Sequence, residues 1–426
     1  MAAMRSVGLV AVHLAALLAV GAGQRSVPGP MPWQPTIERL ESPAAPSSGL
    51  PQLSASSRGI LLSWVERAGS QATLKFAERT GRGWSPVRTA ATGTNWFVNW
   101  ADVPSVLRLD DRTLVAHWLQ KSGSGTYAYD VRLARSTDDG RTWSASTTPH
   151  HDGLQREHGF ASLLPMPGRG LALIWLDGRH TSGTADHDAP GASGGAMSLR
   201  YATFDGQWRQ TSDVQVDDRV CDCCPTTAVM TSEGPLVAYR DRSGDETRDI
   251  YVARLEGRTW STPRAAHADN WQIAACPVNG PRLSARGRDV ALAWFTGKNE
   301  VGRSFVAFSK DAGRSFGGPI RLDTGGSLGR VDVALLPDGS AVASWIESSD
   351  KGGRIAIRRV TPTGGASSPT TVATVSTARI SGYPRMAFHA GELVFAWIEG
   401  DASATRVQTA FAKVPAAAAS APEAHD

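Results

Sequence analysis

One short phrase recurs seven times along the chain, and it limits the folds that the sequence can adopt. In each copy small or β-branched residues lead to an aromatic residue, an apolar residue and usually a polar one, as in Leu62-Ser63-Trp64-Val65-Glu66. Successive aromatic residues lie 54, 57, 64, 55, 51 and 52 residues apart. A repeat of this length is typical of a β-propeller blade, which has four strands. The seven aromatic residues are Trp64, Trp118, Trp175, Tyr239, Trp294, Trp345 and Trp397.

The residues around each aromatic keep the same register. In five copies a proline stands 13 or 14 residues upstream, and proline is tolerated at the first residue of a strand, where its missing N–H does not interrupt the ladder. A third apolar stretch and a glycine-bearing turn follow, as in Gly83-Trp84-Ser85-Pro86. We therefore expect an all-β fold, a seven-bladed β-propeller of four-stranded blades. The five prolines are Pro51, Pro104, Pro225, Pro281 and Pro384.

The two ends of the repeat region predict how the ring closes. The last copy has a third strand near Val407 to Lys413 and no fourth. Near the N-terminus, Trp33-Gln34-Pro35-Thr36-Ile37 is similar to the start of the fourth strand of the first copy. We expect the segment from Trp33 to Leu40 to complete the last blade, which leaves no open sheet edge. A linear solenoid is the alternative.

The first 22 residues have the pattern of a signal peptide. Arg5 precedes an apolar stretch from Val7 to Val20, and small residues stand at the expected cleavage site near Ala22. The stretch is short for an uncleaved membrane anchor, and no other segment is long enough to span a membrane. We expect a secreted or periplasmic protein, with a propeller over residues 23–414 and a disordered tail over 415–426.

The charge balance argues against nucleic-acid binding. The sequence has 44 Lys and Arg against 40 Asp and Glu, mixed along the chain. No basic run of the kind that follows a phosphate backbone is present.

Two turns share an eight-residue motif, Ser136-Thr137-Asp138-Asp139-Gly140-Arg141-Thr142-Trp143 and Ser309-Lys310-Asp311-Ala312-Gly313-Arg314-Ser315-Phe316. An Asp side chain can accept turn amides, glycine permits a positive φ, and the aromatic can pack between sheets. The motif resembles the Asp-box, or BNR repeat, of the sialidase superfamily. The resemblance implies a propeller in which these residues are structural and lie away from the catalytic face. The motif residues are Asp138, Gly140, Trp143, Asp311, Gly313 and Phe316.

The sequence departs from the sialidase pattern in two places. Sialidases have six blades, which is the alternative to the count of seven. Their first arginine stands in a Phe-Arg-Ile-Pro motif, whereas Gly49-Leu50 precedes the first proline here, so the family's arginine clamp is in doubt. Tyr383 is the candidate to stand in for the family's nucleophilic tyrosine, with simple packing as the alternative role.

The repeat also predicts which residues meet on the central face. The segment before each first strand, called the leading segment below, emerges on the same face as the loop after each aromatic strand. Two carboxyl groups there could act as acid and nucleophile or base in a glycoside hydrolase, or could form a rim of salt bridges. The candidate catalytic residues are Glu157, Asp177, Asp241 and Tyr383. The candidate ligand-binding residues are Trp100, Arg156, Arg179, Arg240, Trp271 and Arg330.

All four cysteines fall in leading segments of consecutive units. Cys221, Cys223 and Cys224 precede one proline, and Cys276 precedes the next. In an exported protein such a cluster predicts disulfides, whose pairing the sequence leaves open. The alternative is a soft-metal or redox site, aided by His158 and His180, for which copper is the suitable ion. The spacing is not one that zinc sites use.

The sequence thus favours an exported, sialidase-like propeller that binds a carbohydrate or another small polar ligand, with glycoside hydrolysis as its enzymatic form. Two alternatives stay open. One is a periplasmic copper or redox protein that uses the cysteines, and the other is a non-catalytic interaction propeller. A fold alone cannot choose among them.

Overall fold

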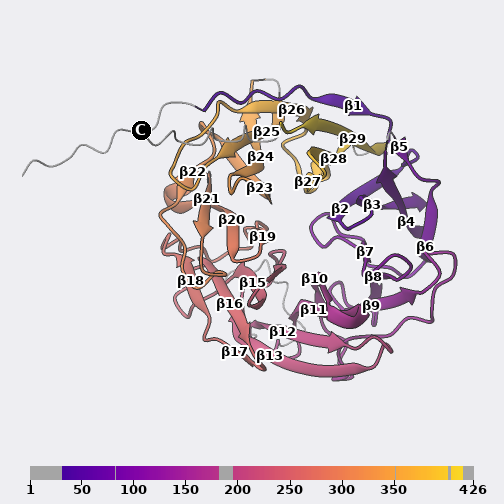
Figure 1. Ribbon diagram of the computed structural model, residues 1–426. Coiled ribbons are helices and arrows are strands. Elements are labelled where there is room, and N and C mark those ends of the chain that lie inside the picture. Colours follow the sequence, from indigo (N-terminus) through magenta and orange to yellow (C-terminus); the bar gives the residue numbers. More distant parts are fainter. Residues whose placement is uncertain (1–30, 82, 182–194, 351, 402–403, 416–426) are drawn as a thin grey trace, which may run out of the picture.

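Seven antiparallel sheets stand like blades around a central channel (Figure 1). The computed structural model describes residues 31–81, 83–181, 195–350, 352–401 and 404–415. The seven-bladed prediction is confirmed, and the six-bladed alternative is wrong. The expected signal peptide lies outside the described residues, as does the expected tail apart from Pro415. No helix in the described ranges is long and apolar enough to cross a membrane.

The first strand of each blade lines the channel and the second carries the repeated aromatic residue. The first strands are β2 (Ser48–Ala55), β7 (Ser105–Arg108), β10 (His158–Met166), β14 (Thr227–Thr231), β19 (Arg282–Arg286), β23 (Ser327–Leu335) and β27 (Arg385–His389). The second strands are β3 (Ile60–Ala68), β8 (Leu114–Lys121), β11 (Gly170–Asp177), β15 (Gly234–Arg240), β20 (Asp289–Thr296), β24 (Ala341–Ser349) and β28 (Glu392–Gly400).

The third strands are regular, whereas the outer strands vary most in length, from 2 residues in β5 to 11 in β13. The third strands are β4 (Gln71–Thr80), β9 (Tyr129–Ser136), β12 (Met197–Phe204), β16 (Ile250–Glu256), β21 (Arg303–Ser309), β25 (Gly352–Val360) and β29 (Thr405–Lys413). The outer strands are β5 (Gly83–Trp84) with β6 (Arg88–Gly93), β13 (Gln210–Val220), β17 (Thr259–Trp260) with β18 (Arg264–His267), β22 (Ile320–Arg321) and β26 (Thr370–Val375). In the second blade the outer strand is reduced to one bridge, Leu133 with Thr147, so the expected fourth strand is missing there.

Each sheet buries both of its faces, which explains the apolar runs in the second strands. Trp64, Trp175 and Trp397 are fully buried. In the described residues one hydrophobic cluster lies between each pair of neighbouring blades. One of these clusters joins Trp64 of the first blade to Val394 of the last, so the apolar packing runs around the whole ring.

The N-terminal strand closes the ring as predicted, over a shorter length. β1 (Glu38–Leu40) pairs antiparallel with β29, with Leu40 opposite Thr409. The Thr409 hydroxyl donates to the Leu40 carbonyl at 2.9 Å. The ladder does not start at Trp33, because that side chain is buried in the cluster between the last two blades. The last blade therefore combines residues from both ends of the described chain (Figure 1).

The first Asp-box has the internal bonds expected of the motif. The Asp138 carboxylate accepts the backbone N–H of Thr142 at 2.9 Å, and the Ser136 hydroxyl accepts that of Gly140 at 2.8 Å. Gly140 has a φ of 78°, and a Cβ there would lie 2.5 Å from the ring of Phe76 in the preceding blade. The turn therefore needs glycine both for its backbone conformation and for its close approach.

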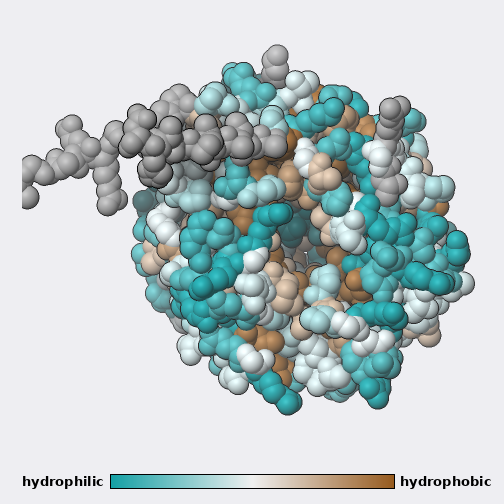
Figure 2. Space-filling view, in the orientation of Figure 1, coloured by the Kyte–Doolittle hydropathy of each residue, from teal (hydrophilic) through white to brown (hydrophobic). Residues whose placement is uncertain are grey.

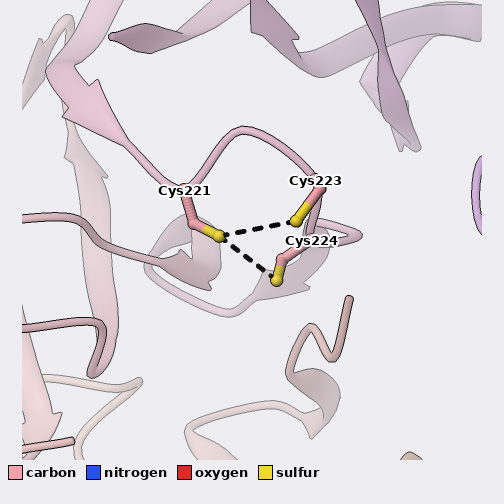
Figure 3. A group of neighbouring side chains, drawn as sticks. All are labelled: Cys221, Cys223 and Cys224. Atoms are coloured by element: carbon pink, nitrogen blue, oxygen red, sulfur yellow. Dashed lines mark hydrogen bonds between the residues drawn. The ribbon is translucent and has the colours of Figure 1, made fainter. Parts of the chain in front are cut away.

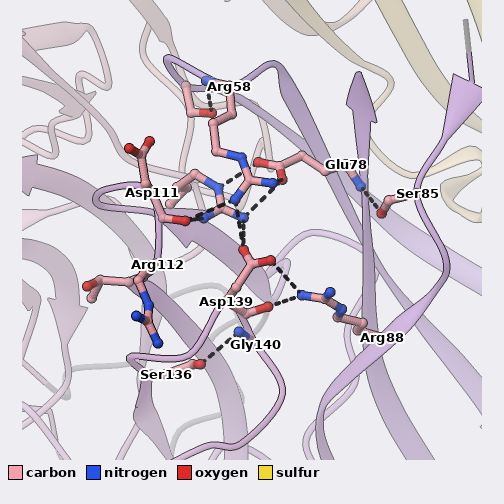
Figure 4. A network of polar contacts seen from close by, with 12 residues as sticks. Arg58, Glu78, Ser85, Arg88, Asp111, Arg112, Ser136, Asp139 and Gly140 are labelled. Atoms are coloured by element: carbon pink, nitrogen blue, oxygen red, sulfur yellow. Dashed lines mark hydrogen bonds and ion pairs between the residues drawn. The ribbon is translucent and has the colours of Figure 1, made fainter. Parts of the chain in front are cut away.

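Asp139, next in the same turn, joins the first two blades (Figure 4). Its carboxylate lies 2.7 Å from Arg108, 3.0 Å from Arg88 and 3.1 Å from Arg58. Arg108 also pairs with Glu78 of the first blade at 2.6 Å, and both side chains are nearly buried.

The second Asp-box, in the fifth blade, repeats this arrangement without the carboxylate. Arg254 and Arg264 of the preceding blade donate to the carbonyls of Ala312 and Gly313 at 2.9 and 2.8 Å. Both boxes therefore bind arginines of the blade before them, and their role in the structure is to join blades.

Truncation tests the closure. A chain that begins at Ser42 loses β1 and exposes the edge of β29, and exposed edges pair with other chains. We expect this chain to aggregate and to melt at a lower temperature than the parent, by light scattering and thermal unfolding. A chain that begins at Met31 keeps every described contact of β1 and is the control. Equal melting and a monomeric state for both chains would contradict closure by β1.

Substitution of a box glycine tests the joint between blades. Gly313 has a φ of 81°, and a Cβ there would lie 2.6 Å from Leu236 of the preceding blade. Gly313→Ala should lower the free energy of unfolding by about 1–3 kcal/mol, measured by urea denaturation. Gly257→Ala is the matched control, because its φ is 65° but a Cβ there meets nothing within 4 Å. An equal loss in both variants would show that the contact with Leu236 contributes nothing.

Candidate functional site

A pocket opens on the central face, and residues from the leading segments of five blades line it. This agrees with the expectation that these segments emerge together. The ring itself is hollowed at its middle, and both polar and apolar residues surround the opening in the face that the space-filling view shows (Figure 2). The lining residues are Phe97, Asn99, Trp100 and Ala101 of the second blade's segment, Tyr127 and Tyr129 at its third strand, Glu157 and Phe160, Asp222 and Cys223, Cys276 and Val278, and Arg379.

Two carboxyl groups share one tyrosine at the wall of this pocket. The Tyr129 hydroxyl lies 2.7 Å from Glu157 Oε1 and 3.1 Å from Asp102 Oδ2. The backbone N–H of Phe160 donates to the same Asp102 oxygen at 2.8 Å. Asp102 is 1% exposed, and its Oδ1 makes no hydrogen bond in the structure. Burial, with the nearby charge of Glu157, raises the pKa of Asp102 to about 7.

The backbone of β10 makes room for this group of three side chains. A Cβ on Gly159 would lie 2.1 Å from Asp102 Oδ2 and 2.7 Å from the Tyr129 ring. The register with β11 shifts between Gly159 and Ser162, and Phe160 has a φ of 51°. This bulge directs the Phe160 N–H toward Asp102, an example of a bulge beside a candidate site.

Aromatic rings also line the pocket. Phe97 stacks on Tyr129 with ring centroids 4.0 Å apart. Trp100 is half-buried and stacks on Tyr383 at 5.7 Å. The Arg330 guanidinium lies 5.0 Å from the Trp100 ring, and Arg379 lies 5.9 Å from it. Apolar and aromatic walls with a few polar groups are typical of small-molecule sites.

Of the four predicted catalytic residues, only Glu157 lines the pocket. Asp177 is fully buried and accepts the Trp175 indole N–H at 2.9 Å, while Arg179 contacts it at 2.7 Å. Tyr383 is 3% exposed, and its hydroxyl donates to the Val278 carbonyl.

The contacts of Asp177 recur in other blades. Glu66 accepts the indole N–H of Trp64, and Glu399 that of Trp397. In each case the acid stands two residues after the tryptophan and also pairs with a cation, Lys75 or Arg39. Asp177 therefore occupies a repeated structural position.

Asp241 lies apart from the pocket lining, in an acidic neighbourhood next to the cysteines. It is 9% exposed, and burial with the charge of Asp217 raises its pKa to about 7.

Some of the predicted ligand-binding residues lie at the pocket, and others make contacts inside or between the blades. Trp100 lines the pocket, and Arg330 lies against its ring while donating to Ser381 and Gly382. Arg240 is fully buried, donates to the carbonyls of Asn279 and Phe295, and lies 4.9 Å from the Trp271 ring. Arg179 pairs with Asp177, and half-buried Arg156 donates to the Gln155 carbonyl.

Three cysteine sulfurs converge below the pocket (Figure 3). Cys221 Sγ lies 3.4 Å from Cys224 Sγ and 3.9 Å from Cys223 Sγ. Cys223 and Cys276 both line the pocket, so the structure brings together the two segments that the sequence placed side by side. All four cysteines are free thiols here. Burial would raise the pKa of Cys221, but hydrogen bonds from Cys223 and Cys224 and the Arg248 charge hold it well below its ordinary value.

His158, predicted to assist the cysteines, belongs to another group of polar residues. Its ring stacks on His150 with centroids 3.7 Å apart, and its Nε2 lies 2.9 Å from Asp152. Burial alone would lower the pKa of His158, but Asp130 and Asp152 raise it to about 9. His180, the other predicted ligand, is exposed.

This histidine pair is also a candidate metal site, with Asp130 as the third ligand. Asp130 Oδ1, His150 Nε2 and His158 Nδ1 are buried and make no hydrogen bond. The two rings are parallel within 8°, however, and each nitrogen lone pair lies in its own ring plane. One ring would have to rotate before both nitrogens could bind one ion.

Sequence reasoning missed Asp102, Tyr129 and Arg248. Asp102 stands in a leading segment, two residues before Pro104, so the repeat does predict that it lies on the central face. Tyr129 begins a third strand, directly after a loop that the repeat directs to the central face, but nothing in the repeat pairs it with Asp102.

The fold and the site together define a seven-bladed propeller with a central-face pocket. No family model and no curated protein matches the chain. Among solved structures the chain is similar to the polysaccharide lyase Uly1, with 10% identity, coverage of 86% of this chain and 90% of that one, and a TM-score of 0.54.

Two further solved structures resemble the chain more weakly. They are the α-L-arabinofuranosidase Arb93A from Fusarium graminearum in complex with an iminosugar inhibitor (12% identity, 89% and 97% covered, TM-score 0.49) and an α-L-arabinanase from Penicillium chrysogenum complexed with arabinobiose (13%, 89% and 99%, TM-score 0.47). Of these similarities, the one to Uly1 bears on the propeller fold, and a shared fold does not by itself show a shared function.

The pH dependence of stability tests the Asp102 environment. Because its pKa is raised from 3.8 to about 7, the fold favours the neutral carboxyl. That stabilisation is complete below about pH 4 and is lost as the pH rises through about 7. Asp102→Asn should therefore lose less thermal stability than the parent between pH 5 and pH 8.

The exposed Asp350→Asn is the control and should follow the parent. If Asp102→Asn also loses as much stability as the parent over this range, Asp102 is ionised in the folded protein already at pH 5.

Proposed function

We propose that this protein binds a carbohydrate in the central-face pocket and hydrolyses a glycosidic bond there. The observation that carries the proposal is the Tyr129 hydroxyl held between Glu157 and Asp102 at the wall of an aromatic-lined pocket. Its similarity in fold to a polysaccharide lyase supports a carbohydrate ligand. The expected export remains a prediction, and it would place the protein where polysaccharides are met.

Asp102, Tyr129 and Glu157 can pass a proton along one chain of hydrogen bonds. A hydroxyl has a single proton, so Tyr129 cannot donate to both carboxyls at once. When Asp102 is protonated it can donate to the Tyr129 oxygen, which leaves the tyrosine proton for Glu157. Because the pKa of Asp102 is about 7, this state is populated near neutral pH. Glu157, which lines the pocket, is then the group that exchanges a proton with the glycosidic oxygen.

A second carboxylate lies on the next blade. Asp222 also lines the pocket, and its Oδ2 forms an ion pair with Arg242 at 2.8 Å. Glycoside hydrolases use one proton-donating carboxyl and one ionised carboxylate, the latter as nucleophile or base. We assign the first role to Glu157 and the second to Asp222. The ring of Trp100 offers an apolar surface for a sugar, since aromatic rings combine apolar faces with polar edges.

Activity on a defined panel tests the proposal. We would incubate the protein with arabinan, ulvan and sialyllactose in water enriched in ¹⁸O, and measure new reducing ends and ¹⁸O in the products by mass spectrometry. Hydrolysis of at least one substrate is expected. Glu157→Gln should lower the rate by about 10²–10⁴-fold, the usual contribution of acid–base catalysis, and leave binding intact. Trp100→Ala should weaken binding.

Glu300→Gln is the matched control, because Glu300 is exposed in a loop on the same face, within the short helix η2 (Lys298–Glu300). It should retain full activity. Unsaturated products without ¹⁸O would show that the protein cleaves the bond by elimination and not by hydrolysis. The absence of both binding and cleavage across the panel would contradict the proposal.

A further inference from the structure

The spacing of the cysteine sulfurs matches ligands around one metal ion. Bonds between thiolates and metal ions such as zinc are about 2.3 Å long, so two sulfurs on one ion lie about 3.8 Å apart in tetrahedral geometry and about 4.0 Å apart in trigonal geometry. Cys221 Sγ lies 3.4 and 3.9 Å from the sulfurs of Cys224 and Cys223, and all three lie within 4.8 Å of one another. A disulfide would need about 2.05 Å.

Two hydrogen-bond donors lie against the cysteine sulfurs. The Arg248 guanidinium is 3% exposed and donates to Cys221 Sγ at 3.2 Å. The backbone N–H of Asn279 donates to Cys224 Sγ at 3.4 Å. A buried cation and an N–H directed at sulfur are the kind of outer contacts that orient and stabilise metal-bound thiolates. Cys221 and Cys224 are buried, whereas Cys223 is half-buried and lines the pocket, so an ion can enter from the central face.

We propose that Cys221, Cys223 and Cys224 bind one Cu(I) ion below the central-face pocket. Soft thiolate ligands select Cu(I), zinc or iron–sulfur clusters. Structural zinc needs four closed ligands, and Cys276 is not part of the group of three sulfurs that converge in the described structure. Three thiolates with a positive side chain beside them suit a monovalent soft ion in three-coordinate geometry. Cys276, which borders the pocket next to Cys223, lies at the mouth of the site.

This inference does not depend on the proposed carbohydrate function, because it uses different residues and a different ligand. The two share only the pocket, through Cys223. Loss of copper binding would therefore leave the hydrolase proposal standing, and the reverse also holds.

Titration with Cu(I) tests the proposal. The full protein would be reduced under anaerobic conditions, freed of reductant, and titrated with Cu(I) in competition with bathocuproine disulfonate. One equivalent of Cu(I) per chain should bind, with an ultraviolet thiolate-to-copper absorption band. Cys221→Ser and Cys224→Ser should each lower the affinity by more than tenfold, while circular dichroism shows that the fold is kept.

Cys276→Ser is the matched control, since it removes the fourth thiol and leaves the three ligands. It should still bind one equivalent. The proposal would be overturned if reduced protein bound no Cu(I), if Zn(II) displaced bound Cu(I), or if Cys276→Ser lost binding as completely as Cys221→Ser. Thiol counting on the untreated protein provides a second check: a Cys221–Cys224 disulfide that persists in the presence of Cu(I) would also overturn it.

Discussion

The burial of both faces of every sheet is the constraint on which the rest of this structure depends. A propeller blade has no solvent-facing side of its own, so each second strand is buried over most of its length and each aromatic residue lies between two sheets. The ring must also close, because an end blade would leave one face and one edge in water. Pairing of β1 with β29 and the cluster that joins Trp64 to Val394 satisfy both requirements.

Closure also determines where chemistry can occur. Strand interiors are committed to packing, so side chains with freedom to bind a ligand come from the leading segments at the central face. The Gly159–Phe160 bulge shows how such a segment is shaped: it leaves space for Tyr129 and turns a backbone N–H toward Asp102. The Asp-boxes stand at turns that follow third strands, where Asp139 pairs with Arg58 and Arg88 of the preceding blade and takes no part in the pocket.

The repeat made most of the fold predictable, since period, register and the N-terminal match all depend on local sequence. The same reasoning placed the cysteines together, because their offsets from Pro225 and Pro281 are short. The repeat could not show which of the acidic residues line the pocket. Asp177 and Glu157 both belong to the central face by topology, yet one accepts an indole N–H inside a blade and the other lines the pocket. The shared offset of Glu66, Asp177 and Glu399 from their tryptophans was the available signal. The pairing of Tyr129 with Asp102 depends on a bulge, which no period in the sequence shows.

The central claim is that the central-face pocket, with Glu157 and Tyr129 at its wall, is where the ligand binds. A crystal structure of the Glu157→Gln protein, soaked with an oligosaccharide from a polysaccharide that the parent cleaves or binds, tests this most directly. We expect sugar density next to residue 157 and Tyr129, with a ring against Trp100. Density confined to another part of the molecule, such as the groove lined by Arg286, Leu336 and Phe388, would contradict the account.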